Sequence, residues 1–158
     1  MILRETIGKL PKQKGGYYFL KIEGKIVEQI SRGKATRLIC NINEVVSIRC
    51  GLNHFGDGNF SIIISSKNFK LLGLQLGAKV SFDLKEDPNP LGVDIPEVLD
   101  ALLIQDEELK KQFNNYTDGK KRSLIYTINR VKNIDLQIEK ALNFFEEERL
   151  KSLRKKRN

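Results

Sequence analysis

Residues 62–82 read IIISSKNFKLLGLQLGAKVSF, and this stretch decides the fold. Its β-branched start is typical of a strand, and Ser65 or Ser66 can cap the short amphipathic piece that follows. Gly73 suits the left-handed residue that ends a helix, and Gly77 permits a turn back into a second alternating strand. The stretch therefore predicts a strand, about one and a half turns of helix, a glycine corner and another strand.

Residues 17–85 continue this pattern, because apolar and polar positions alternate through most of them. Two longer segments, 17–30 and 36–50, read as strands, and the second turns as a hairpin near Asn43 and Glu44. So many short strands are typical of a small barrel and not of an α/β layer. We therefore predict an α+β fold that starts with a closed or nearly closed β-barrel of about six or seven strands.

The segment 86–96 reads EDPNPLGVDIP and interrupts the alternation. Its prolines disfavour helix at the residues before them, and Glu86 and Asp87 read as solvated turn residues. After this segment the apolar period changes from two to about 3.6, which predicts three or four helices. Asp106 and Asp135 are the expected caps of two of them.

The ends of the chain differ from the part between them. The apolar stripe of the last helix ends at Phe145, before the run EEER, so the residues that follow have little to pack against. Gly15 and Gly16 read as a hinge between a loose start and the first strand. We expect a flexible N-terminal arm at 1–16, a β-barrel domain at 17–94, a helical module at 95–148 and a basic tail at 149–158.

The net charge of +8 is concentrated near the C-terminus, since residues 107–158 hold 14 basic and 8 acidic side chains. Such a patch attracts phosphate backbones, whereas the plainer interpretation is a solvated helix end whose cations complement the helix dipole. Lys120, Lys121 and Arg122 lie at a helix start, where they either serve an anion or meet nothing that penalises them. Against nucleic-acid binding stand the absence of tryptophan and of an aromatic–basic strand pattern. The candidate nucleic-acid contacts are Lys120, Lys121, Arg122, Arg130, Lys132, Arg149, Lys151, Arg154, Lys155, Lys156 and Arg157.

Residue patterns typical of catalysis or metal binding are missing. His54 is the single histidine, no serine has a G-x-S-x-G context, and no glycine-rich phosphate loop occurs. Cys40 and Cys50 meet no zinc spacing; we expect buried thiols, although they flank a hairpin turn and a cross-strand disulfide is conceivable. The sequence therefore predicts no enzyme, no cofactor and no metal. An enzyme that uses His54 and Cys50 in the barrel mouth is the minor alternative.

Residues 52–103 resemble the small β-barrel called domain of unknown function 1905, through their order of hairpin, GDG turn, strand, glycine corner, strand and proline loop. Residues 119–147 resemble the helical module of the YdeI/OmpD-associated, or bacteriocin-protection, family. Many members carry a tryptophan and a Thr-Arg pair there, whereas this chain has Thr127 near the tryptophan position and DLQ at 135–137. The resemblance puts a site built on those residues in doubt here, and it implies a fold without an established activity.

A weaker similarity links residues 62–82 to the AbrB-like swapped-hairpin regulators, which bind DNA as dimers through a basic face. The matching unit here carries only Lys67, Lys70 and Lys79. Phosphate contacts usually involve several cations at once. We therefore interpret this similarity as a shared structural solution.

The remaining expectations concern location and partners. No apolar run approaches the roughly 18–20 residues needed to span a bilayer, and the N-terminus is charged from Arg4 onward, unlike a secretory signal. The leading hypothesis is a non-enzymatic cytoplasmic binding or interaction module for an unknown protein or small ligand. The alternative is a nucleic-acid-binding protein that uses the basic C-terminal surface. Exposed strand edges leave both a monomer and a homodimer open.

Overall fold

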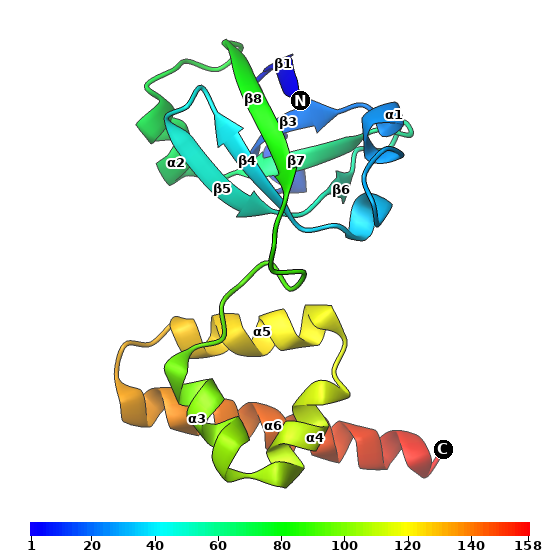
Figure 1. The fold of residues 1–158 in the computed structure, drawn as a ribbon, viewed down its shortest axis with the longest axis vertical. Helices are drawn as coiled ribbons and strands as arrows, with labels where there is room; N and C mark the ends of the chain where they lie inside the picture. The colour runs from blue at the N-terminus through cyan, green and yellow to red at the C-terminus, as the bar shows by residue number, and fades with distance from the viewer. The chain divides into compact units, whose positions relative to one another are not determined.

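The alternating segments pair into two antiparallel sheets of four strands each in the computed structural model, which describes residues Met1–Asn158 (Figure 1). Sheet A has the strand order β1 (Ile2–Thr6), β8 (Lys79–Glu86), β4 (Leu38–Ile42) and β5 (Val46–Cys50). Sheet B has the strand order β2 (Gly8–Lys9), β3 (Tyr18–Ile22), β7 (Phe60–Ile64) and β6 (Asn53–His54). Both sheets belong to a unit that spans Met1–Gly92 and is called the β unit below.

Both sheets are open, so the predicted closed or nearly closed barrel is wrong, whereas the α+β class is confirmed. Strands β1 and β5 form the edges of sheet A, and β2 and β6 form those of sheet B. Alternating apolar residues predict which side of a strand faces the core, but the pattern is the same in a barrel and in two packed sheets. Closure needs edge strands long enough to pair with each other, and β2 and β6 have only two residues each.

The inner faces of the two sheets share one hydrophobic core. Sheet B contributes Leu20, Ile22, Ile62 and Ile64. Sheet A contributes Leu38, Cys40, Ile42, Val80 and Phe82. Because successive side chains of a strand alternate, the residues between these form the outer faces of the sheets, where ligands have access.

The stretch that decides the fold forms the predicted elements. After β7 comes α2 (Ser66–Leu72), and the Ser65 side chain accepts a hydrogen bond from a backbone amide of this helix at 3.1 Å. Gly73 ends the helix with a left-handed φ of 65°. The hairpin between β4 and β5 turns at Asn43 and Glu44, whose φ values are 49° and 58°. These local features are confirmed.

Residues 1–16, expected to be a flexible arm, hold two strands instead. The whole of β1 pairs with β8, and Ile7 is 1% exposed in the core. Arg4 and Glu5 made this segment look solvated, but charged side chains are common on an edge strand such as β1. The arm prediction is therefore wrong for these strands.

The predicted strand at residues 17–30 is β3 followed by the short helix α1 (Gly24–Val27). The Gly24 amide donates a hydrogen bond to Asn59 Oδ1 at 2.9 Å, in the turn before β7. A Cβ on Gly24 would collide with the Gly58 carbonyl oxygen, so this close approach needs glycine. Two 3-10 turns, η1 (Lys12–Lys14) and η2 (Gly33–Ala35), complete the β unit.

Residues Val93–Asn158 form the helical unit. Its helices are α3 (Glu97–Gln105), α4 (Glu107–Asn114), α5 (Asp118–Asn129) and α6 (Ile134–Lys156). Its buried apolar side chains are Leu99, Leu103, Phe113, Leu124, Ile125, Ile128, Ala141 and Phe145. No helix of the chain combines the length and the apolar character that crossing a membrane requires.

The caps of the helical unit were predicted in part. Asp106 caps α4 by accepting hydrogen bonds from two backbone amides at 2.9 and 3.1 Å, as expected. Asn133, and not Asp135, caps α6, because its side chain accepts from the Leu136 amide at 3.1 Å. The expected basic tail is the last part of α6, which continues to Lys156.

Candidate nucleic-acid interface

Helix α6 continues past the hydrophobic core of the helical unit. Phe145 is its last buried residue, and every side chain from Arg149 to Asn158 is exposed. This segment, the free end of α6, holds six basic residues and no acidic one. Its helical part up to Lys156 extends by roughly 12 Å. The free end is therefore a cationic helix that contributes nothing to the core.

Lys120, in the first turn of α5, meets this helix at Glu148. The Lys120 amine lies 2.7 Å from Glu148 Oε2, and the Lys151 amine lies 3.2 Å from Glu148 Oε1. The Thr117 side chain caps α5 by accepting a hydrogen bond from the Lys120 amide at 3.2 Å, which holds Lys120 at this end of the helix. The groove at this junction is lined by Lys120, Glu148, Lys151, Ser152, Arg154 and Lys155.

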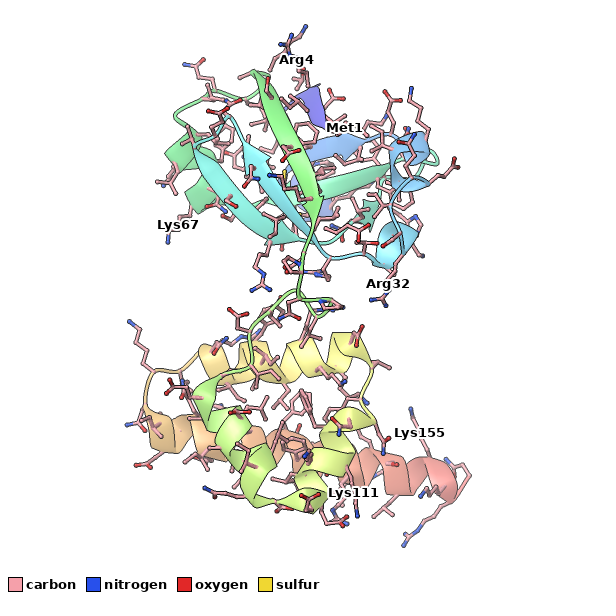
Figure 2. All side chains as sticks on the ribbon, viewed as in Figure 1. Met1, Arg4, Arg32, Lys67, Lys111 and Lys155 are labelled. Carbon is pink, nitrogen blue, oxygen red and sulfur yellow. The ribbon has the colours of Figure 1, made fainter.

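A second groove shares Lys120 and Glu148 with the first and reaches Lys111 of α4. The Lys120 amine is 5.4 Å from the ring centroid of Tyr116, within the range of a cation–π contact. The cations that line the two grooves are called the basic corner: Lys111, Lys120, Arg149, Lys151, Arg154, Lys155 and Lys156. Figure 2 shows that the labelled Lys111 and Lys155 lie at the same end of the helical unit.

Carboxylates offset the charge of the basic corner only in part. The hydrogen bond from Lys120 lowers the pKa of Glu148 below its usual value, although burial acts in the opposite direction. Glu146 accepts two hydrogen bonds from Arg149 at 2.7 and 2.9 Å. Glu108 also lines the second groove. Seven cations thus face three carboxylates, and the basic corner keeps a net positive charge.

Several of the sequence-predicted contacts lie outside the grooves. Arg130 follows the last turn of α5, and Lys132 lies in the connection to α6. Lys120 lies at the opposite end of α5, whose 12 residues rise by roughly 18 Å. The predicted contacts that line neither groove are Lys121, Arg122, Arg130, Lys132 and Arg157.

Lys111 is the groove residue that sequence reasoning missed. It lies in the run DEELKKQF, where neighbouring acidic residues balance its charge. Its amine is 3.3 Å from Glu108 Oε1, an exposed pair one helical turn away. Only the packing of α4 beside the junction of α5 and α6 places Lys111 in the second groove. No signal within its own segment indicates this position.

The minor alternative of a catalytic His54 and Cys50 finds no shared pocket. His54 is exposed on β6, and its Nε2 lies 2.9 Å from the Lys34 amine. Cys50 is 8% exposed and belongs to the core. Burial raises the pKa of both the Cys40 and the Cys50 thiol to about 12, which leaves them protonated and unreactive at neutral pH. Both cysteines are free thiols.

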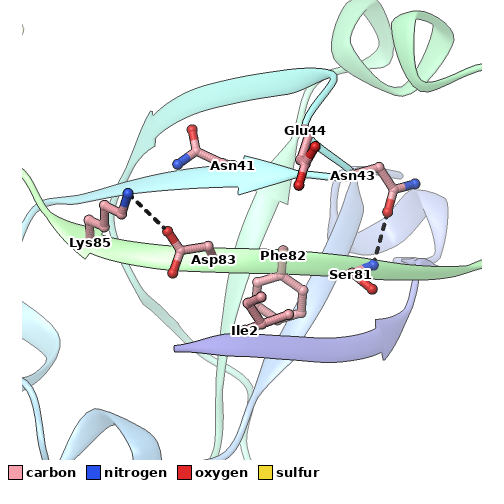
Figure 3. Close-up of a pocket in the computed structure, with 8 residues that line it drawn as sticks. All are labelled: Ile2, Asn41, Asn43, Glu44, Ser81, Phe82, Asp83 and Lys85. Atoms are coloured by element: carbon pink, nitrogen blue, oxygen red, sulfur yellow. Dashed lines mark hydrogen bonds and ion pairs between the residues drawn. The ribbon is translucent and has the colours of Figure 1, made fainter.

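Another concave surface lies on the outer face of sheet A, between Ile2, Asn41 and Asn43 (Figure 3). Asn43 Oδ1 accepts a hydrogen bond from the Ser81 amide at 2.9 Å, and the Lys85 amine lies 3.4 Å from Asp83. These polar groups are thus occupied by partners within the β unit. Nowhere in the chain do three His, Cys, Asp or Glu side chains gather in a way that could hold a metal ion.

Comparisons with known proteins add no relative: no family model, no curated protein and no solved structure matches this chain. The resemblance to the YdeI/OmpD-associated family stays a prediction.

Proposed function

We propose that this protein is a non-enzymatic binding module that holds nucleic acid through the phosphate backbone at the basic corner. The observation that carries the proposal is the free end of α6, where six cations stand in solvent without an acidic residue among them. Lys111 and Lys120 join them from two other helices. A nucleic-acid backbone presents closely spaced charges that several cations can meet at once. A cytoplasmic location is part of this proposal.

The directions of these cations favour nucleic acid over an anionic membrane. Successive residues of an α-helix are rotated by roughly 100°, so Lys151, Arg154 and Lys155 share one side of α6. Arg149 and Lys156 lie on another side, where they line the second groove. A helix that lies on a membrane has one broad apolar face opposite one cationic face. The free end has only two apolar residues, Leu150 and Leu153, and each is more than half covered, at 41% and 45% exposed. A polyanion in the grooves can contact cations on several sides.

The broader hypothesis, an unspecified protein or small ligand, has less support. The concave surface on sheet A would be its natural site, but Asn43 there already bonds the Ser81 amide, and Asp83 and Lys85 form an ion pair that offsets their charges. The basic corner, in contrast, has more cations than carboxylates, so its net positive charge attracts an anion. Nucleic acid is the ligand that this excess charge fits best.

The test is fluorescence anisotropy of the full chain with labelled duplex DNA, single-stranded DNA and RNA, at about 50 and 200 mM salt. We expect binding that weakens steeply with salt. The double variant Lys151→Gln, Lys155→Gln removes two groove cations and should lower the slope of log affinity against log salt by about 2.

The matched control is Arg130→Gln, Lys132→Gln, which removes two cations at the other end of α5. It should leave the slope unchanged, because neither residue lines a groove. Equal effects of the two double variants would mean that only net charge matters, and the absence of binding at low salt would refute the proposal.

A further inference from the structure

The outer face of sheet B carries a hollow lined by aromatic, amide and cationic side chains, which the proposed function does not use. Its volume is about 440 Å³, within the range of roughly 300–1,000 Å³ that is typical of ligand pockets. The lining residues that matter here are Lys14, Tyr17, Asn53, His54 and Phe55. They come from the hairpin between β2 and β3 and from the chain around β6.

Two aromatic rings line this hollow, and one of them is placed for stacking. Tyr17 is 54% exposed, so about half of its side chain meets solvent. Its ring lies directly against Gly15, where a Cβ would collide with it, so the backbone fixes one side of the ring. Phe55 packs against Phe19 with 5.2 Å between the ring centroids. The Lys21 amine also lies 5.0 Å from the ring centroid of Phe55, so this ring is occupied on the protein side by two partners. Tyr17 is therefore the ring that is free to stack, and Phe55 forms an apolar wall of the hollow.

The charges around the hollow are of one sign. Residues 7–22 contain four lysines and no acidic residue, and no carboxylate lines the hollow. Lys12 and Lys14 make no ion pair. The nearby Asp57 is paired with Lys21 at 2.8 Å. The ligand that complements this surface is therefore an anion with flat, apolar rings.

Asn53 adds a group that can recognise such rings. Its Nδ2 lies 3.5 Å from the Ser61 carbonyl oxygen, and its Oδ1 makes no hydrogen bond. Asparagine amides pair well with the donor and acceptor edges of nucleobases. Since Asn53 is exposed, its Oδ1 can accept a hydrogen bond from an exocyclic amine of a base stacked on Tyr17.

We propose that this hollow is a binding site for single-stranded nucleic acid. A base stacks on Tyr17, Asn53 contacts its edge, and Lys12 and Lys14 meet the phosphates. The ligand is single-stranded because the base faces of a duplex are covered by neighbouring bases, whereas those of a single strand are free to stack on aromatic side chains. The site lies on the β unit and does not require binding at the basic corner.

The experiment compares a labelled oligodeoxycytidine single strand, whose bases carry the exocyclic amine that Asn53 can contact, with a duplex of the same length, by anisotropy with the full chain. Tyr17→Ala should weaken single-strand binding by roughly 5- to 150-fold, the range found when a stacked aromatic residue is removed. Duplex binding should stay as it is. Tyr17→Phe keeps the ring and should bind as the unaltered protein does. The matched control is Tyr126→Ala, which removes a tyrosine of α5 that is 46% exposed.

Thermal melting checks that each variant is folded. Should Tyr17→Ala unfold, Lys14→Gln on the exposed η1 turn provides the second test and should lower the single-strand salt slope by about 1. The inference is overturned if Tyr17→Ala and Tyr126→Ala bind single strands equally, or if Tyr17→Ala weakens duplex and single strand alike. The double variant Lys151→Gln, Lys155→Gln separates the two proposals. It lowers the affinity for both the single strand and the duplex only if the basic corner binds phosphates.

Discussion

Asp87 is the one charged residue that the fold buries. Its carboxylate accepts hydrogen bonds from Arg49 Nε at 2.6 Å and Arg49 Nη2 at 3.2 Å, and from the Asn89 amide at 2.9 Å. The sequence alone predicts a solvated turn residue at this position, because Asp87 precedes a proline in a polar segment. Its burial depends on Arg49, a residue of β5 that lies 38 positions earlier in the chain, and no local pattern indicates that pairing.

Asp87 should make the stability of the β unit depend on pH. The hydrogen bonds from Arg49 lower the pKa of Asp87 in the folded chain. The ionised carboxylate therefore stabilises the fold above the unfolded pKa of about 4, and this stabilisation is lost as the pH falls through the lower folded value. We expect Asp87→Asn to cost about 2–3 kcal/mol at neutral pH and to reduce the loss of stability in acid.

Urea denaturation at neutral and acidic pH measures both effects of Asp87→Asn. Glu28→Gln is the control, because Glu28 is exposed and makes no ion pair. An Asp87→Asn variant whose stability depends on pH as steeply as that of the unaltered chain would contradict this role.

At the scale of elements, the features that could be predicted are those that neighbouring residues decide. The turn at Asn43 and Glu44 and the left-handed Gly73 depend on local backbone preferences. The pairing of β1 with β8 joins Ile2 to Asp83, far apart in sequence, and two short edge strands leave both sheets open. The aromatic hollow was missed for the same reason, because Tyr17 and Phe55 meet only when β3, β7 and β6 pair.

The cap of α2 tests one such local prediction. The Ser65 hydroxyl accepts a hydrogen bond from the Asn68 amide at 3.1 Å, whereas Ser66 already belongs to the helix. Ser65→Ala should therefore lower the free energy of unfolding by about 1 kcal/mol. Ser66→Ala should change it by less than about 0.5 kcal/mol. Thermal or urea unfolding compares the two variants directly. Equal losses in the free energy of unfolding would show that the Ser65 hydroxyl does not stabilise the start of α2.

At the scale of the whole molecule, the division into units changes the interpretation of the charge. The β unit holds 14 basic and 8 acidic side chains, and the helical unit holds 14 and 12. When the chain is instead divided after residue 106, as in the sequence analysis, most of the net charge falls in the C-terminal part. The helical unit owes its basic corner to segregation, since six of its cations gather at the free end of α6, whereas the β unit carries the larger net charge. Both units thus have a physical reason to bind an anion.

The cations of the free end lie outside the hydrophobic core of the helical unit. This separation predicts the stability and the DNA affinity of a chain that ends at Glu148. It lacks the six cations of the free end, but it keeps Phe145, the last buried residue of α6, and the Lys120–Glu148 pair. We expect its melting temperature to stay within about 2 °C of that of the full chain, because exposed residues contribute little to stability. Its affinity for duplex DNA at low salt should fall by at least about tenfold, as the loss of several phosphate contacts requires. Circular dichroism and anisotropy measure the two quantities.

A large drop in melting temperature would show that the free end packs against the helical unit. An unchanged affinity for duplex DNA would mean that the lysines of the β unit, and not the basic corner, bind the phosphates.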